Sequence, residues 1–440
     1  MPSYKKRREK LLTEMKDGVA IICAAHHQTR SHDTEYPFRQ NSHFKYLTGL
    51  NTPESILVLM QNNKEVRTVL FMQAKDQVKE QWTGIRMGAE KAKEITGVDQ
   101  AYDLEEFDQK IEGYLTGHRN LYIDLFSNHE FFNKLRMKAA GLMIKKRRPA
   151  PSPVNFIHLP KIIDHIRLIK EDYEIEKIKQ AVAATTKGHL AGMSFVAPGK
   201  NEKELQGLIE YIFIKEGSDA PAYGTIAAGG VNGNILHYVE NDKPLNDGEM
   251  VLVDAGAEYD SYASDVTRTY PINGKFTENQ RKFYGAILEV QKKAIEMCRP
   301  GITQKDIHNL VVEGLTQALI SLGVLSGDLE ENIKNENFKK YFPHGTGHWM
   351  GLDVHDPNPY LADSGEDLKL EAGMVFTIEP GLYLPAEDAN VPKEFRGMAC
   401  RIEDDILITK TGYENLTLMI AKEIDEIEKI CAADYMEYLK

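Results

Sequence analysis

Four carboxylates set among apolar residues constrain this chain more than any other feature of its sequence. Three of them follow or interrupt a run rich in valine, leucine, isoleucine or phenylalanine, and the fourth lies in the more polar segment SYASDVTRTYPI: Asp254, Glu379 and Glu403, and then Asp265. An isolated carboxylate is costly to bury as an anion, so a fold that buries these runs has to supply compensating charge. A purely structural use is therefore not expected for Glu379 and Glu403, although either glutamate taken alone leaves both a structural and a functional interpretation open.

The first two acids lie in one predicted hairpin, in which two apolar strands flank a turn. Centred between residues 259 and 260, this hairpin places Asp254 opposite Asp265, with Cβ atoms about 5 Å apart. Like charges are unfavourable in such a pair. We expect either Arg268 or a metal ion to compensate them, whereas surface or turn roles are the common alternative for an isolated aspartate pair.

Histidines gather in one glycine-rich segment. HGTGHWMGLDVHD, residues 344–356, contains His344, His348 and His355 among the 14 histidines of the chain. Its glycines allow the backbone to bend sharply or to approach a ligand. A fourth candidate is His237 in GNILHYVEN, although a lone histidine is usually structural.

Four carboxylates and one imidazole suit a pair of divalent cations, because four negative charges balance two doubly positive ions. The mainly oxygen donors favour Mn²⁺, with Co²⁺, Fe²⁺ or Zn²⁺ as other occupants, and argue against a thiolate zinc site. Two ions roughly 3.5–4 Å apart can share a hydroxide nucleophile and polarise a carbonyl. The residues alone therefore predict a metal-assisted hydrolase.

The chain of 440 residues is expected to fold as two domains, residues 1–165 and 166–440. The first alternates helical and extended patterns, which is typical of a small α/β domain. A proline-containing basic segment, KKRRPAPSPVNF at 145–156, breaks both patterns. The second domain is predicted to open with a helix near 172–186, followed by helices with capping residues and by acid-bearing strands, in an α+β arrangement with internal pseudo-symmetry. The capping residues expected at three of these helices are Asn201, Thr277 and Thr303.

Composition excludes several classes of protein. The chain has 54 Lys and Arg against 66 Asp and Glu, a formal net charge of −12, so a nucleic-acid footprint is not expected, and only KKRR at 145–148 favours one. No apolar run approaches about 18 residues, and the start does not resemble a signal peptide. Four dispersed cysteines without a C-x-x-C pair indicate a reducing compartment. We expect a cytoplasmic protein that binds neither nucleic acid nor membrane.

At these residues the chain resembles the pita-bread metallopeptidases, the M24 family that includes methionine aminopeptidase, prolidase and Xaa-Pro aminopeptidase. The family's five metal ligands are matched, in order and in sequence context, by Asp254, Asp265, His348, Glu379 and Glu403. The segments DTEYPFRQNSHFKYLTGL (33–50) and EQWTGIRMG (80–88) are similar to the Xaa-Pro aminopeptidase branch. The resemblance implies an α/β N-terminal domain and an α+β catalytic pita-bread domain with internal pseudo-two-fold symmetry.

The resemblance also implies a role for each matched ligand. Asp254 would chelate one metal ion, and His348 and Glu379 would bind the other. Asp265 and Glu403 would bridge the two ions. Glu379 would in addition shuttle a proton from the bridging water to the leaving nitrogen.

Further residues match positions around the family's active site. His237 and His355 would donate hydrogen bonds to the scissile carbonyl and the tetrahedral intermediate, and His344 would line the site. Arg401 would steady an acidic ligand or a substrate carbonyl, and Tyr383 would line the pocket.

In the first domain, Asp33 matches an acid that reaches toward the active site. Trp82 matches an aromatic residue that a neighbouring subunit contributes, with an ordinary packed surface aromatic as the alternative. A homodimer or homotetramer is therefore expected. Gly347 departs from the serine that related bacterial enzymes often carry, a change expected to alter loop stiffness more than chemistry.

The implied reaction removes the N-terminal residue from peptides whose second residue is proline. That bond is a tertiary amide without an N–H, so peptidases that read this hydrogen bond act on it poorly. The nearest alternative is prolidase, which cleaves Xaa-Pro dipeptides and has to recognise the free proline carboxylate. An alternative of another class is a non-catalytic pita-bread module that binds a protein partner or histone, but such modules typically lose ligands that this chain retains.

Overall fold

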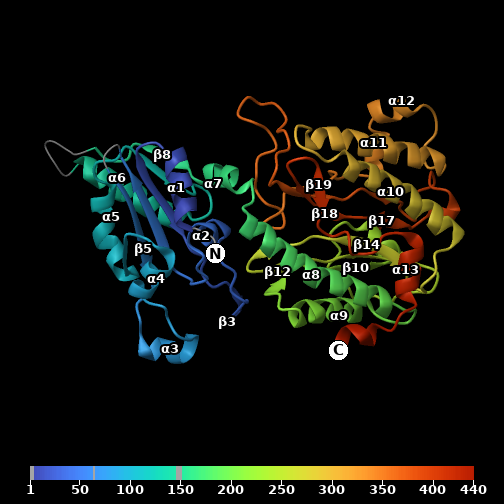
Figure 1. The fold of residues 1–440 in the computed structure, drawn as a ribbon, viewed down its shortest axis with the longest axis horizontal. Coiled ribbons are helices and arrows are strands. Elements are labelled where there is room, and N and C mark those ends of the chain that lie inside the picture. The colour runs from blue at the N-terminus through green and yellow to red at the C-terminus, as the bar shows by residue number, and fades with distance from the viewer. Residues whose placement is uncertain (1–3, 63–64, 145–150) are drawn as a thin grey trace. The chain divides into compact units, whose positions relative to one another are not determined.

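The structure is a computed structural model that describes residues 4–62, 65–144 and 151–440. The chain divides into two units, one ending at Arg167 and the other beginning at Leu168 (Figure 1). The basic run at 145–148 and the first half of the expected connection, up to residue 150, lie outside the described residues.

The first unit is built on a mixed sheet. Its strands are β1 (Gly18–Cys23), β2 (Thr29–Ser31), β3 (Thr34–Glu35), β4 (Ile56–Gln61), β5 (Val66–Met72), β6 (Gln100–Asp103), β7 (Asn120–Ile123) and β8 (Asn155–His158). Its helices are α1 (Tyr4–Glu14), α2 (Ser42–Thr48), α3 (Gln77–Thr83), α4 (Ala89–Thr96), η1 (Leu104–Glu106), α5 (Phe107–Leu115), α6 (His129–Ile144) and α7 (Pro160–Arg167). Six strands pair in the order β6-β5-β4-β1-β7-β8, and β2 pairs with β3.

Apolar runs decide where the strands of the first unit form. The apolar runs SILVLM at 55–60 and VRTVLFM at 66–72 form the antiparallel pair β4–β5. Val58 and Phe71 of this pair share a buried core with Phe107 and Ile111 of α5. The α/β organisation predicted for this part of the chain is confirmed.

The second unit contains two helix pairs and a set of short strands. Its helices are α8 (Asp172–Phe195), α9 (Glu202–Lys215), η2 (Gly230–Asn234), α10 (Glu278–Met297), α11 (Gln304–Ser321), α12 (Leu329–Lys334), η3 (Asn337–Lys340), η4 (Lys393–Phe395), α13 (Ile424–Cys431) and η5 (Tyr435–Leu439). Its strands are β9 (Ala220–Pro221), β10 (Ile226–Gly229), β11 (Met250–Asp254), β12 (Ala257–Tyr259), β13 (Tyr262–Ala263), β14 (Thr267–Pro271), β15 (Val375–Ile378), β16 (Gly381–Tyr383), β17 (Ala399–Arg401), β18 (Asp404–Ile408) and β19 (Tyr413–Asn415).

Capping residues start the main helices of the second unit where the sequence predicts. Asn201, Thr277 and Thr303 each form a capping box at the start of α9, α10 and α11. The first helix is longer than predicted, because α8 continues past residue 186 to Phe195, and the next helix-breaking residue is Pro198.

The same order of elements occurs twice in the second unit, which confirms the predicted pseudo-symmetry. The pair α8–α9 precedes a hairpin in which β11 pairs with β14 and continues as β12–β13. The pair α10–α11 precedes a second hairpin, in which β15 pairs with β18 and continues as β16–β17. Both hairpins are interrupted at the acidic residues.

The predicted register of the first hairpin is wrong. Asp260 and Ser261 both have positive φ, 49° and 69°, and form the turn, so the hairpin is centred one residue later than expected. Asp254 therefore pairs with Thr267, and Asp265 lies two residues before that partner. In the second hairpin, the strand expected across residue 403 breaks at residues 402–403, and the flanking pairs place Glu379 opposite Glu403.

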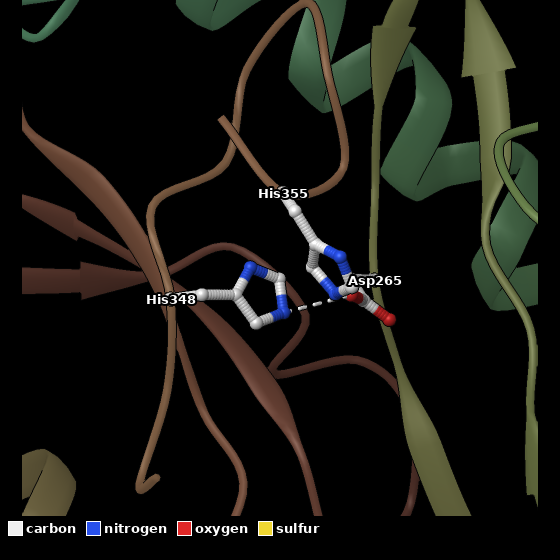
Figure 2. Close-up of side chains that lie close together, drawn as sticks. All are labelled: Asp265, His348 and His355. Carbon is white, nitrogen blue, oxygen red and sulfur yellow. Dashed lines mark ion pairs between the residues drawn. The ribbon is translucent and has the colours of Figure 1, made fainter. Parts of the chain in front are cut away.

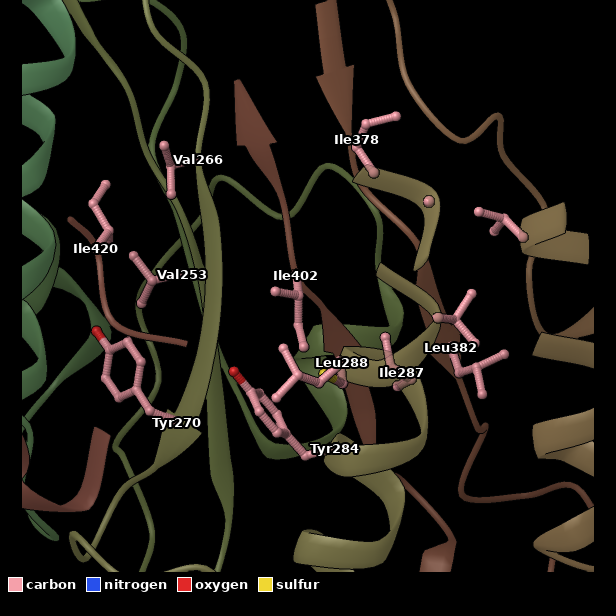
Figure 3. Packing of buried hydrophobic residues seen from close by; sticks show 14 of the residues in the cluster. Val253, Val266, Tyr270, Tyr284, Ile287, Leu288, Ile378, Leu382, Ile402 and Ile420 are labelled. Atoms are coloured by element: carbon pink, nitrogen blue, oxygen red, sulfur yellow. The ribbon is translucent and has the colours of Figure 1, made fainter. Parts of the chain in front are cut away.

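Alternation along β11 separates the core from the site. Val251 and Val253 lie in a large apolar core, to which the helices α10 and α11 also contribute. Figure 3 shows Val253 in this core together with Ile287 and Leu288 of α10. Leu252 packs into a smaller cluster on the other face, and Asp254 lies on the same face as Leu252. No described helix is both long and apolar enough to cross a membrane.

Candidate metal centre

One cavity of about 410 Å³ collects most of the predicted site residues. It lies within the second unit, and the interrupted hairpins and two loops supply its lining. The predicted residues that line it are His237, Asp254, Asp265, His344, His348, His355, Glu379, Arg401 and Glu403. These residues come from six separate stretches of a 167-residue span, so their approach depends on the fold.

Three overlapping groups of side chains could each hold a divalent ion. Within each group, one candidate ligand atom per residue lies within 4.8 Å of the others. The groups are Asp254, Asp265 and Glu403; His348, Glu379 and Glu403; and Asp265, His348 and His355. Asp265, His348 and Glu403 each belong to two groups. Of these three, Asp265 and Glu403 are carboxylates whose two oxygens allow one side chain to contact two ions, which is the arrangement that two ions sharing ligands require.

The imidazole of His348 is oriented for ligation through Nε2. Its Nδ1 lies 3.1 Å from the carbonyl oxygen of Trp349 and donates to it, which leaves Nε2 facing Asp265 Oδ2 at 3.3 Å (Figure 2). The ring of His355 stands nearly perpendicular to that of His348, with centroids 4.3 Å apart. Burial opposes the charged form of His348, but the hydrogen bond to Asp265 and the charges of Asp265 and Glu379 raise its pKa to about 9.

The carboxylates of the cavity carry more negative charge than His348 and Arg401 compensate. Burial, together with the charges of Asp265 and Glu379, raises the pKa of Glu403 well above its ordinary value. Burial also raises the pKa of Glu379 to about 7, although His348 and Arg401 oppose the shift. The pKa of Asp254 is raised mainly by burial, against the opposing charge of Arg401. An acidic, oxygen-rich donor set that repels itself fits a pair of divalent cations.

Arg401, and not Arg268, is the guanidinium at the acids. Its Nη2 donates to Asp254 Oδ2 at 2.5 Å, and its Nε donates to Thr267 Oγ1 at 3.0 Å. The expectation that Arg268 compensates the aspartates is wrong, because its side chain points to the opposite side and pairs with Asp404 at 2.7 Å. The register of β14 explains this, since Arg268 and Thr267 lie on opposite faces of the strand.

A chain of hydrogen bonds connects Arg401 to His344. Arg401 Nη1 donates to Tyr383 Oη at 2.8 Å, and that hydroxyl lies 2.9 Å from His344 Nε2. His344 Nδ1 lies 2.7 Å from the carbonyl oxygen of Gly345 and donates to it, so Nε2 accepts from Tyr383. Burial and the charge of Arg401 lower the pKa of His344 to about 4, which keeps the ring neutral. Tyr383 is buried behind the cavity lining rather than part of it.

Three further residues contact the acids and are not predicted from the sequence. Tyr223 Oη lies 2.6 Å from Asp254 Oδ1 and 2.5 Å from Asp265 Oδ1. Thr267 Oγ1 donates to Glu403 Oε2 at 2.7 Å, and Asp405 Oδ2 accepts the backbone N–H of Asp265 at 3.1 Å. No motif marks Tyr223, but the alternation along β14 could have placed Thr267 beside the acids.

Gly347 permits a close approach of two backbones. A Cβ at this position would overlap the carbonyl oxygen of Thr377 in β15. The neighbouring backbone pairs with the same strand, because Thr377 N donates to the carbonyl oxygen of His348 at 2.9 Å. Glycine thus holds the His348 segment against β15, which is a more specific role than loop stiffness.

Two predicted site residues belong to the first unit. The side chain of Asp33 is exposed, and Trp82 on α3 is 86% exposed. Neither is among the described residues that line the cavity. The alternative that Trp82 is an ordinary packed aromatic is not supported, because α3 has no buried residue.

Comparisons with known proteins cover both units. The family model of metallopeptidase family M24 matches residues 176–410, and that of the aminopeptidase P N-terminal domain matches residues 4–122. The Xaa-Pro aminopeptidase of Escherichia coli strain K12 is 40% identical over 435 residues, 98% of this chain and 97% of the relative. Two solved structures of E. coli aminopeptidase P are also similar to this chain: one is zinc-substituted and in complex with product, and the other contains the inhibitor Pro-Leu. Each is 39% identical to this chain, with a TM-score of 0.94, and the matches cover 98–99% of this chain and 98% of the solved chains.

Proposed function

Because the chain belongs to metallopeptidase family M24, we propose that it is an Xaa-Pro aminopeptidase. It hydrolyses the bond between an N-terminal residue and a following proline. Relatives of this name extend over nearly the whole chain, and both units match family models. The observation that carries the proposal is the buried cluster of four carboxylates and His348, whose three overlapping donor groups fit two ions.

Two divalent ions, when bound, would supply a Lewis acid and an activated water to the amide. Asp254 would bind one ion, and His348 with Glu379 would bind the other. Asp265 and Glu403 would contact both, because each belongs to two donor groups and has two carboxylate oxygens to offer. The oxygen-rich ligand set favours Mn²⁺ over softer ions. The third donor group also leaves His355 within reach of an ion, besides its expected contact with substrate.

Glu379 is proposed to carry the proton between the nucleophilic water and the leaving nitrogen. It lines the same cavity as the other proposed ligands and shares a donor group with His348 and Glu403, so its carboxylate would lie beside a metal-bound water. His237 and His355 line the same cavity and would donate hydrogen bonds to the scissile carbonyl. Two roles were expected for Arg401, steadying an acidic ligand or steadying a substrate carbonyl. Its 2.5 Å hydrogen bond to Asp254 supports the first of these roles. His344 and Tyr383, linked to Arg401, would hold the cavity wall.

Further parts of the proposal concern the whole molecule. The N-terminal aminopeptidase P domain would comprise residues 1–165 and the catalytic pita-bread domain residues 166–440. The exposed Trp82 would complete the site of a neighbouring copy within a homodimer or homotetramer, and the exposed Asp33 would reach toward an active site. A cytoplasmic location would keep Cys23, Cys298, Cys400 and Cys431 as the free thiols that they are in the structure.

Cleavage of a tripeptide tests this proposal. Metal-stripped protein, with and without added Mn²⁺, is incubated with an Xaa-Pro-Yaa tripeptide and, in parallel, with the Xaa-Pro dipeptide. We expect Mn²⁺-dependent release of the first amino acid, clearly faster from the tripeptide. Activity confined to the dipeptide would instead indicate prolidase, and no activity on either peptide would favour a binding module.

A further inference from the structure

His237 lies on a loop with little regular structure of its own. The loop connects β10 to β11, and residues 235–249, all of which the structure describes, form no helix and no strand beyond one bridge at Pro244. His237 is exposed and lines the cavity, whereas its neighbour Tyr238 is 5% exposed and packs against Ile226 and Leu252. The position of the His237 ring therefore depends on what holds this loop.

A single buried carboxylate holds the loop on both sides of His237. Glu202, the first residue of α9, has no exposed surface. Its Oε1 accepts from the backbone N–H of Gly229 at 2.8 Å and from Asn232 Nδ2 at 2.9 Å. Its Oε2 accepts from Tyr238 Oη at 2.8 Å and from the backbone N–H of Lys243 at 2.9 Å. Two of these donors precede His237 in the chain and two follow it.

Only an ionised carboxylate satisfies this arrangement. Its two oxygens offer about four acceptor positions and no donor, which matches four donors in two pairs. Glutamine would place an NH₂ group against one of the two pairs. Burial of the charge is costly, and the N-terminus of α9 offsets part of that cost. A loop that only connects two strands does not need a buried anion. The free-energy cost of burying the Glu202 carboxylate therefore indicates that the position of this loop matters.

We propose that Glu202 is a positioning residue for the reaction, which fixes the loop so that His237 reaches the scissile carbonyl. The inference rests on the proposed function, because it takes the role of His237 from there. Glu202 touches neither substrate nor metal ion and acts only through His237. Displacement of a catalytic group by about 1 Å can cost on the order of 100-fold in rate.

A double-mutant cycle on the Mn²⁺-loaded full-length protein tests the proposal. kcat and KM for an Xaa-Pro-Yaa tripeptide are measured for the wild type, Glu202→Gln, His237→Ala and the double variant. We expect Glu202→Gln to lower kcat/KM by about 10–100-fold, mostly in kcat, because the contact with the carbonyl strengthens in the transition state. In the His237→Ala background the same substitution should change kcat/KM by less than about 3-fold, since the group it positions is gone.

Each other outcome overturns the proposal at an identifiable step. Equal losses in both backgrounds would mean that Glu202 acts independently of His237, and an unchanged Glu202→Gln variant would mean that the loop needs no anchor. If His237→Ala keeps full activity, the role of His237 fails and the positioning role fails with it. If the wild type cleaves no Xaa-Pro peptide, the proposed function itself is wrong.

Two further variants guard against misfolding. Tyr238→Phe removes one of the four donors and keeps the buried ring, so it should give a smaller loss of kcat that also disappears in the His237→Ala background. If Glu202→Gln does not fold, the Tyr238→Phe variant tests whether the contacts of Glu202 position His237. Glu204→Gln is the matched control, because Glu204 lies on the same helix, is exposed and forms a capping box that glutamine also supports. It should keep the wild-type kcat, and bound Mn²⁺ should be the same in all variants.

Discussion

Two adjacent acids, Glu403 and Asp404, are both buried, but their surroundings differ completely. Asp404 opens β18 and pairs with Arg268 at 2.7 Å and Lys422 at 2.6 Å. Burial opposes its ionisation, yet these two cations hold the pKa of Asp404 well below its ordinary range. Glu403, on the opposite face, has other carboxylates as neighbours, and burial with those charges raises its pKa well above the ordinary value.

The difference shows how a structural acid is distinguished from an acid of a site. Arg268 and Lys422 balance the negative charge of Asp404 within the chain. These ion pairs belong to the folded structure, and no uncompensated negative charge is left there to bind a metal ion. Around Glu403 the chain supplies too little positive charge, because Arg401 forms its ion pair with Asp254 and offsets only part of the repulsion at Glu403. Charge left unbalanced in a buried cluster has to come from outside, and divalent ions are the natural source.

Removing the proposed proton carrier should have the largest effect. Glu379→Gln keeps the shape and an oxygen ligand but cannot carry a proton, so kcat for an Xaa-Pro-Yaa tripeptide should fall by about 10²–10⁴-fold. Bound Mn²⁺, measured by metal analysis after dialysis, should be largely retained. The exposed Glu366 provides the control, and Glu366→Gln should keep the wild-type rate. Undiminished turnover by Glu379→Gln would remove the assigned role.

Neutralising each of the two adjacent acids should separate stability from function. Asp404→Asn leaves the buried cations Arg268 and Lys422 without their negatively charged partner. The free energy of unfolding should therefore fall by about 3–5 kcal/mol. Glu403→Gln relieves repulsion and keeps an acceptor for Thr267, so metal-stripped protein should lose less than about 0.5 kcal/mol. Urea unfolding in the presence of a chelator measures both. Equal losses would mean that the acids of the cavity are as structural as Asp404.

Metal binding should release protons, because the ligands hold them in the metal-free protein. At pH 7 His348, with a pKa of about 9, is protonated and has to lose its proton to bind an ion. Proton release should therefore decrease between pH 7 and pH 9, while Mn²⁺ affinity increases. A pKa raised in the folded state also means that the metal-free protein loses stability as the pH rises through this range. Calorimetric titration in buffers of different ionisation enthalpy measures the release, and a heat independent of the buffer would contradict the prediction.

Local signals predicted much of the framework. The helices that start at Asn201, Thr277 and Thr303 were predictable because these side chains accept hydrogen bonds from N–H groups of the first turn. Both partners of such a hydrogen bond lie within four consecutive residues, so a short stretch of sequence is enough to recognise it. The acids could be recognised because carboxylates among apolar residues conflict with burial. The two-domain division and the individual roles of the site residues stay predictions.

Contacts between distant segments could not be predicted in the same way. Both residues of the turn at 260–261 have positive φ. Aspartate and serine adopt positive φ only occasionally, so neither residue marks the turn in the sequence. The centre of the hairpin was therefore predicted one residue too early. Arg268 was expected at the aspartates because it is near in sequence, but strand alternation turns it away. Glu202 carries no sequence signal beyond its place in a helix start, and its four bonds depend on a loop more than 25 residues away.

The number of ions bound at saturation tests most directly whether the buried acids form a dinuclear site. Metal-stripped protein is dialysed against increasing Mn²⁺, and bound metal per chain is measured beside tripeptide cleavage, for the wild type and Glu403→Gln. We predict two ions per wild-type chain, activity that rises with their binding, and much weaker binding by Glu403→Gln, because Glu403 belongs to two donor groups. A wild-type chain that binds no Mn²⁺, or a Glu403→Gln variant that binds two ions as tightly, would contradict the assignment.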